Sequence, residues 1–153
     1  MNNAIDINSN TTEANWVEHF VNNFNSLNAQ NLNNLQDIYH NDIVFTDPVH
    51  RIEGYDELLS YFSHLYQNLI HSHFDVHHKI VQANEAAIYW TMELSHQRLN
   101  KGQPFSVEGH SHIKHKNGLI IYHRDYFDFG QMVYEQLPLV GSLVKLIKSR
   151  VAK

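Results

Sequence analysis

The chain contains no cysteine, only three prolines and six glycines, and no long apolar run. Without cysteine it forms neither disulfides nor thiolate sites, which is compatible with a reducing cytoplasm, where we expect the protein to be located. No apolar segment approaches the roughly 20 residues that cross a bilayer. The opening residues MNNAIDINSN lack the basic start and apolar centre of a secretory signal, and we predict that residues 1–11 are a disordered lead-in.

Basic residues are also few. The chain has 11 lysine and arginine residues against 16 acidic ones, a formal net charge of −5. Proteins that bind nucleic acid usually carry a basic surplus, so we expect no nucleic-acid partner. Histidine, in contrast, is abundant, with 13 residues that gain charge below a pH of about 6.5. The length of 153 residues and the hydrophobic content of 42% are sufficient for one domain with its own core.

The first half of the chain shows mainly helical periodicity. An apolar stripe at helical spacing predicts an amphipathic helix that begins at Thr12. The stripe consists of Trp16, Phe20, Phe24 and Leu27. We predict a shorter helix over residues 32–39 and a third helix over residues 58–69. Between them, residues 43–46 are predicted to form a short strand that ends before Pro48, which cannot donate to a ladder.

From Phe74 onward the periodicity changes to two, which is typical of half-buried strands. Four strand-like segments follow one another, over residues 74–83, 86–97, 103–115 and 118–129. The Asn117-Gly118 dipeptide between the last two is a strong hairpin signal. Helices followed by an antiparallel meander predict an α+β fold with the helices on one face of a curved sheet.

Residues 131–153 are predicted to form a C-terminal helical extension that is apolar and basic, with no acidic residue after Glu135. Such a helix can lie on an anionic membrane. It can also dock on its own domain or on a dimer mate, with its lysines directed outward, and we favour docking.

Two short motifs connect this pattern to a known family. TDPV spans residues 46–49 at the end of the first strand, and HRDYFD spans residues 123–128 on the last strand. Together with the order of helices and strands, they make residues 12–130 resemble the SnoaL-like family of the nuclear-transport-factor-like superfamily. This resemblance implies a cone-shaped, cystatin-like α+β barrel, in which N-terminal helices wrap a strongly curved sheet around a pocket for a small apolar ligand. It also implies homodimers formed through the outer face of the sheet, and no cofactor.

The resemblance implies roles for particular residues. TDPV is similar to the segment that carries the proton-shuttling base of ketosteroid isomerases, and that base corresponds to Asp47. HRDYFD is similar to the segment of limonene epoxide hydrolases whose first aspartate activates water, and that aspartate corresponds to Asp125. The second carboxylate of the hydrolases falls near Glu93 and their arginine near Thr91. The isomerase tyrosine falls near Asn23, so neither catalytic set is complete here.

Alternation along the strands predicts which side chains face the pocket. His123, Asp125 and Phe127 share one face, which the resemblance makes the inner one. His123 and Asp125 are then close enough to form a hydrogen-bonded pair. The same register places a second group inward: Tyr89, Thr91 and Glu93. It leaves an apolar outer row that a dimer would cover: Ile88, Trp90, Met92 and Leu94.

Two interpretations of the polar residues remain open. Asp47 is either a catalytic base or the cap of a turn at Pro48, since Asp-Pro steps often begin turns. His123 and Asp125 are either a proton-transferring pair or a buried polar network that only defines the strand register. The remaining substrate-binding candidates are two donors and three apolar wall residues: Tyr39, Ser111, Trp16, Phe24 and Phe127.

Two HSH segments place pairs of imidazoles on one strand face, at residues 71–73 and 110–112. A catalytic zinc needs three converging ligands, and the strand register directs His110 and His112 outward, so we assign no metal site. We therefore expect a cofactor-independent acid–base enzyme of the isomerase, cyclase or hydrolase type, acting on a small apolar, oxygen-bearing molecule. The alternative is a non-catalytic binding module for a lipophilic molecule or a protein.

Overall fold

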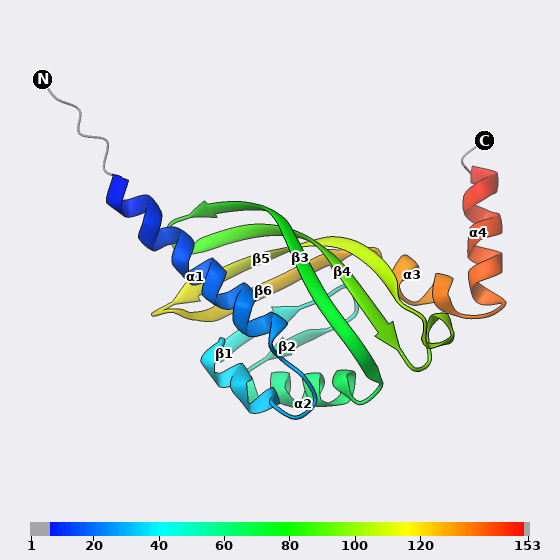
Figure 1. Ribbon diagram of the computed structural model, residues 1–153, viewed down its shortest axis with the longest axis horizontal. Helices are drawn as coiled ribbons and strands as arrows, with labels where there is room; N and C mark the ends of the chain where they lie inside the picture. The colour runs from blue at the N-terminus through cyan, green and yellow to red at the C-terminus, as the bar shows by residue number, and fades with distance from the viewer. Residues whose placement is uncertain (1–6, 152–153) are drawn as a thin grey trace, which may run out of the picture.

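The computed structural model describes the backbone of residues 7–151 and the side chains of residues 15–151. Its centre is one six-stranded sheet with the strand order β2-β1-β6-β5-β4-β3 (Figure 1). The strands are β1 (Tyr39–Thr46), β2 (Arg51–Glu53), β3 (Leu69–Gln82), β4 (Glu85–His96), β5 (Phe105–Lys116) and β6 (Leu119–Phe127). Neighbouring strands are antiparallel except β1 and β6, which are parallel. The predicted α+β class with a mostly antiparallel sheet is therefore confirmed.

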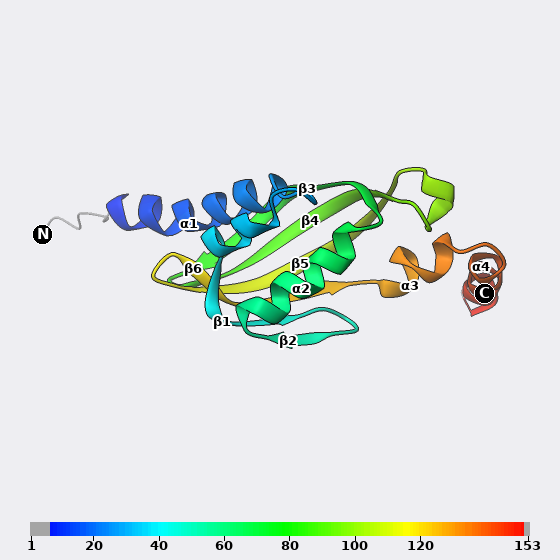
Figure 2. The same ribbon diagram turned by 90° about the horizontal axis from the view of Figure 1, so that it is seen from below.

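Two helices pack on one face of this sheet, which is the inner face. They are α1 (Ile7–Asn25) and α2 (Tyr55–Tyr66). Phe20 of α1 packs against His123 of β6, and Phe62 of α2 packs against Phe45 of β1. Figure 2 shows the sheet bending beside these helices. This packing confirms the expected curved sheet wrapped by N-terminal helices.

Several boundaries differ from the predictions. α1 begins at Ile7, before the expected start at Thr12, so the predicted disordered lead-in is helical from residue 7. Residues 1–6 of that lead-in lie outside the described residues. The predicted second helix is a 3₁₀ segment, η1 (Leu32–Asp37), and a further 3₁₀ turn, η2 (Asn100–Gly102), precedes β5. Strand β2 was not predicted, because three residues are too short for a periodic pattern to appear.

The C-terminal extension is helical, as predicted. It consists of α3 (Phe129–Met132), the 3₁₀ turn η3 (Tyr134–Gln136) and α4 (Val140–Val151). Figure 1 shows α4 standing apart from the sheet, at the end of the molecule opposite to the first turns of α1. None of the helices between residues 7 and 151 is long and apolar enough to cross a membrane.

The inner face of β4 supplies much of the hydrophobic core. Four alternate residues of this strand are buried: Ile88, Trp90, Met92 and Leu94. The sequence analysis assigned this row to the outer face and placed Tyr89, Thr91 and Glu93 inside, and both assignments are wrong. In a sheet that is covered on one face, the apolar row turns to the covered side. A register error of one residue inverts every side chain of a strand, which explains why the two errors occur together.

The predicted hairpin between β5 and β6 is confirmed by its backbone angles. Asn117 and Gly118 both have positive φ, 53° and 86°. Positive φ at two central residues is the signature of a type I′ turn, whose twist matches that of the flanking strands.

The indole of Trp90 packs directly over Gly109, its cross-strand neighbour on β5. A Cβ atom at position 109 would collide with three atoms of the six-membered ring of the indole. On the other side, the indole Nε1 donates a hydrogen bond to Ser111 Oγ at 2.9 Å. Gly109 and Ser111 together define the position of Trp90.

We expect Gly109→Ala to lower the free energy of unfolding by about 1–3 kcal/mol, because the added methyl group overpacks the site. Trp90→Phe removes part of the colliding ring, so Gly109→Ala should cost less in that background. Urea unfolding of the two single variants and the double variant measures this coupling. An equal cost in both backgrounds would show that contact with Trp90 is not the cause.

Candidate functional site

A narrow cavity lies between α1 and the inner face of the sheet. Its lining residues are Phe20, Val21, Phe24, Phe74, Val76, Ile88, Trp90, Ser111, His123 and Asp125. Its volume of about 20 Å³ accommodates one water-sized sphere. The walls are thus mainly aromatic and aliphatic, and the polar groups come from β5 and β6.

These polar groups belong to a chain of hydrogen bonds that runs across β4, β5, β6 and β1. Trp90 donates to Ser111, and the Ser111 hydroxyl lies 2.5 Å from Asp125 Oδ1. The same Oδ1 lies 2.8 Å from His123 Nε2, which confirms the expected contact within this pair. On the far side of the ring, His123 Nδ1 lies 2.8 Å from the Tyr39 hydroxyl. The chain therefore connects four strands through buried or half-buried side chains.

His123 is held from both sides of its ring. Its Nε2–H donates to Asp125 Oδ1, because a carboxylate oxygen can only accept. Its Nδ1 shares the second hydrogen bond with the Tyr39 hydroxyl. Burial, then the charge of Asp125, raises the pKa of Tyr39 well above its ordinary value, so this phenol stays protonated. The two bonds orient the imidazole toward Asp125.

One oxygen of Asp125 is open. Both hydrogen bonds of the carboxylate end on Oδ1, and no described residue bonds to Oδ2. The side chain lines the cavity and is 17% exposed. A ligand in the cavity therefore meets a carboxylate whose first oxygen is held in place and whose second oxygen is available.

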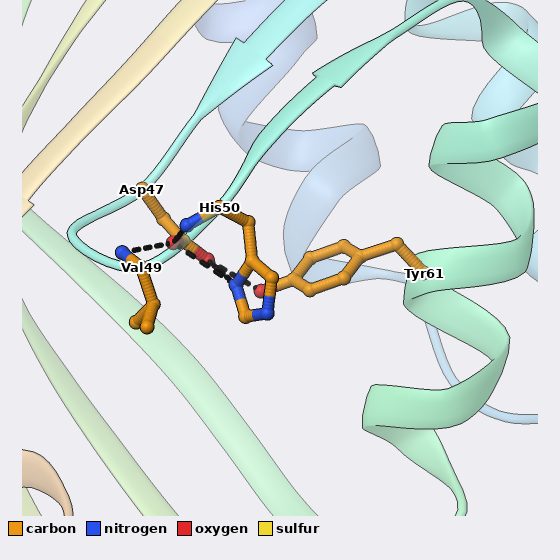
Figure 3. A network of polar contacts seen from close by, with 4 residues as sticks. All are labelled: Asp47, Val49, His50 and Tyr61. Carbon is orange, nitrogen blue, oxygen red and sulfur yellow. Dashed lines mark hydrogen bonds and ion pairs between the residues drawn. The ribbon is translucent and has the colours of Figure 1, made fainter.

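Asp47 lies in a different environment, at the turn between β1 and β2 (Figure 3). Its Oδ1 accepts from the backbone N–H groups of Val49 at 2.8 Å and His50 at 2.7 Å. Its Oδ2 accepts from the Tyr61 hydroxyl at 2.6 Å, and the His50 ring lies 3.2 Å from both oxygens. Only 7% of the side chain is exposed. Of the two open interpretations, the geometry supports the cap of the turn at Pro48.

The hydrogen bonds of Asp47 also determine its charge state. Burial by itself would raise the pKa of Asp47, but the bonds from Tyr61, from the two backbone N–H groups and from the His50 ring lower it below the ordinary value. The effect on the partner is opposite, because burial and then the bond to Asp47 raise the pKa of Tyr61. The charge of Asp125 contributes to the same rise, so Tyr61 experiences the charges of both aspartates.

The structure brings five of the predicted site residues together. Phe24, Ser111, His123 and Asp125 line the cavity, and Tyr39 supports the ring of His123 from behind. Asp47 lies one step beyond the last residue of β1 and does not line the cavity.

Five other predicted residues lie elsewhere. Three of them are on the outer face of β4: Tyr89, Thr91 and Glu93. Trp16 packs against His115, with 4.5 Å between ring centroids and the rings tilted by 34°, beside the β5–β6 hairpin. Phe127 is on the inner face but packs against Trp90 at 6.2 Å without lining the cavity.

Sequence reasoning missed the main aromatic walls, which are Phe20, Phe74 and Trp90. The inward direction of Trp90 could have been inferred from β5. His110 and His112 were expected to face outward, which directs Ser111 between them inward, and the burial of Ser111 confirms this. Directly paired residues share a face, so Ile88, the β4 partner of Ser111, also points inward, and so does Trp90 two residues later. No local pattern marks Tyr61 on α2.

The groups at the cavity suit proton transfer and hydrogen bonding. They are one free carboxylate oxygen, one hydroxyl and one imidazole. Within the part of the chain that the structure describes, no three histidine, aspartate or glutamate side chains converge as metal ligands do.

Comparison with known proteins supports the fold. A family model described as a SnoaL-like domain matches residues 17–123. An NTF2-like protein of unknown function from Burkholderia pseudomallei is similar in structure, with a TM-score of 0.68 and 15% identity over 79% of this chain and 94% of that chain. A candidate SnoaL-like polyketide cyclase from Jannaschia sp. CCS1 has a TM-score of 0.69 and 12% identity over 84% of this chain and 93% of that chain.

A third similar structure carries a ligand. It is a protein with a ketosteroid isomerase-like fold from Catenulispora acidiphila, in complex with trimethylamine. Its TM-score is 0.67 at 15% identity, over 80% of this chain and 93% of that chain. No curated protein matches the chain. At these identities the structural likenesses establish the fold and not the chemistry.

We expect Tyr61→Phe to lower the free energy of unfolding by about 1.5–3 kcal/mol at pH 7, because it removes a hydrogen bond to a buried carboxylate. A carboxylate whose pKa is lower in the folded than in the unfolded protein stabilises the fold at every pH above the unfolded value. This stabilisation is lost as the pH falls through the folded value. The difference between wild type and Tyr61→Phe should therefore be full at neutral pH and shrink below the ordinary Asp47 value of 3.8.

Urea unfolding at neutral and acidic pH measures this difference. Asp47→Asn is the matched control, since the neutral amide removes the titrating group while keeping its shape. If the effect of Tyr61→Phe is as large in acid as at pH 7, the ionised Asp47 is not the group that Tyr61 stabilises.

Proposed function

The chain belongs to the SnoaL-like family, and from that premise we propose that it is an acid–base enzyme with Asp125 as its base. Its substrate is a small apolar, oxygen-bearing molecule held between α1 and the sheet. The observation that carries this proposal is the asymmetric hydrogen bonding of Asp125. Ser111 and His123 hold Oδ1, and Oδ2 accepts no hydrogen bond from the described residues. A positioned carboxylate inside apolar walls is what general-base catalysis requires.

In the proposed step, Asp125 Oδ2 takes a proton from a carbon atom next to a carbonyl group of the ligand. The C–H bond breaks, its electron pair enters the enolate, and the negative charge moves from Asp125 to the ligand oxygen. As Asp125 becomes neutral, it attracts the Ser111 hydroxyl less, and this hydroxyl can rotate toward the new oxyanion. Ser111 then supplies the donor that the isomerases take from the tyrosine replaced here by Asn23.

A second candidate function, binding without turnover, is supported by the charge of the site. Within the described residues, His123 is the only basic side chain at ion-pair distance from Asp125, and no lysine or arginine pairs with this carboxylate. Aromatic walls and a carboxylate without a lysine or arginine partner together favour a small organic cation with apolar substituents. The trimethylamine bound to the Catenulispora protein is a ligand of this class.

The same pair of variants tests both functions. Asp125→Asn and Asp47→Asn make an identical chemical change, one at the cavity and one at the turn. For the enzyme, we expect the wild type to exchange the α-hydrogens of small apolar ketones for deuterium from D₂O, measured by mass spectrometry. Asp125→Asn should slow this exchange by about 100-fold or more, the usual contribution of a general base, and Asp47→Asn should leave it nearly unchanged.

If the protein is a receptor, binding of trimethylammonium should change the fluorescence of Trp90. This is measured in the Trp16→Phe variant, in which Trp90 is the remaining tryptophan. Asp125→Asn should abolish this change, and Asp47→Asn should preserve it. Saturable binding with no exchange of any ketone tested would favour the receptor. Exchange that survives Asp125→Asn would contradict the enzymatic proposal.

We also propose that the outer face of the sheet forms a homodimer. The apolar row that the sequence analysis invoked is in the core, but a ladder of rings crosses the outer face instead. His78, Tyr89, His110 and Tyr126 lie in contact in this order, and Arg124 lies over Tyr126 at 4.8 Å. Exposed tyrosines of this kind are enriched in protein–protein interfaces.

Light scattering should then give about twice the monomer mass of 17.9 kDa. Tyr126→Glu, which places a charge in the ladder, should give the monomer mass. Tyr134→Glu is the control, because Tyr134 is exposed but lies outside the sheet. A monomeric wild type at micromolar concentration would contradict the dimer.

A further inference from the structure

α4 is attached to the rest of the protein through one side only. Gly141 is buried against the backbone of Glu135, which leaves no room for a side chain at position 141. Two turns further on the same side, Lys148 forms ion pairs with Glu135 and Asp128. The contact side of the helix is therefore small and polar.

The apolar side of α4 has no partner among the described residues. With a rotation of about 100° per residue, the large apolar side chains fall on an arc that points away from the contact side. Five of them are exposed: Val140, Leu143, Leu146, Ile147 and Val151. This outcome contradicts the expectation that the helix docks on its own domain through its apolar face.

The charged residues of α4 are all basic. Lys145 and Arg150 are exposed, and neither pairs with an acidic side chain in the described part of the chain. No acidic residue follows Glu135 in the sequence. Lys145 and Lys148 lie on the side of Gly141, and Arg150 lies within the apolar arc. An apolar arc opposite a face that carries lysine is the pattern of helices that lie in the interface of a membrane.

We propose that α4 is a membrane-surface anchor that lies flat on anionic lipid. The exposed apolar side chains enter the boundary between headgroups and acyl chains, and the long side chain of Arg150, which stands within the apolar arc, binds a lipid phosphate. Because α4 projects from the end of the molecule, it reaches such a surface before the sheet does (Figure 1). The remainder of the chain is acidic and is repelled by anionic lipid, so the molecule approaches with α4 first.

Charge also favours anionic lipid over a second copy of α4 as the partner of the apolar face. Two copies of α4 that paired through their apolar faces would enclose the Arg150 charges of both copies in one apolar interface, which is costly unless the charges are paired. The helix has no acidic residue to pair with them. An anionic lipid surface offers the opposite charge along the whole helix.

Vesicle sedimentation of the full chain tests the proposal. We expect binding to vesicles made of phosphatidylcholine and phosphatidylglycerol in equal amounts, and much weaker binding to phosphatidylcholine alone. Ile147→Ser should weaken binding roughly tenfold or more, because the lost side chain no longer enters the apolar boundary. Arg150→Gln should weaken binding to the anionic vesicles about fivefold, with little effect on neutral ones.

The matched control is Ile80→Ser on β3. Ile80 is 53% exposed and Ile147 is 54% exposed, so the two variants remove the same side chain from equally accessible positions. Ile80→Ser should bind vesicles like the wild type. Absence of sedimentation with anionic vesicles, equal binding to both vesicle types, or equal effects of the two serine variants would each overturn the proposal. So would a self-association that Ile147→Ser abolishes, because α4 would then be covered by a second copy.

Discussion

A carboxylate beneath aromatic walls is stable only if its oxygens find donors, since an unpaired polar group in an apolar site costs several kcal/mol. Asp125 meets this condition through Ser111 and His123, and each of these is held in turn by Trp90 or Tyr39. The chain of bonds therefore links β4, β5, β6 and β1 at one level of the sheet. Because a slip of one residue would send its members to opposite faces, the buried carboxylate also enforces the register of these strands.

The two aspartates of the inner face show how hydrogen bonding separates structural from chemical roles. Both oxygens of Asp47 accept bonds, from the turn and from Tyr61, so this carboxylate has no capacity left for a ligand. Asp125 uses a single oxygen for the protein. The bonds of Asp47 join α2 to the β1–β2 turn, so the role of Asp47 is structural. The chemistry of the site then depends on Asp125, whose position the rest of the network defines.

Much of this arrangement could be predicted from local patterns. Helices and strands were found because apolar residues repeat at the period of each structure. Alternation on β6 placed His123 and Asp125 on one face, and the resemblance identified this face correctly as the inner one. β4 could not be oriented in this way, because aromatic residues stand on both of its faces and its register was inferred from a distant resemblance. The pairing of β4 with Ser111 on β5 was the information needed to orient Trp90 inward. The role of Asp47 depended on a tyrosine from α2, and contacts between distant segments leave no periodic signal.

The small volume of the cavity follows from how α1 is fastened to the sheet. β3 is an edge strand, and the Asn25 side chain pairs with both backbone groups of Phe74 at 2.9 Å, so the last turn of α1 covers groups that would otherwise lack a strand partner. Further up the helix, the link is an exposed ion pair between Glu18 and Lys79, a type of contact that contributes about 0–1 kcal/mol. Two backbone hydrogen bonds are harder to break than this pair. α1 is therefore held to the sheet most firmly at its last turn, beside the cavity residues Phe24 and Phe74.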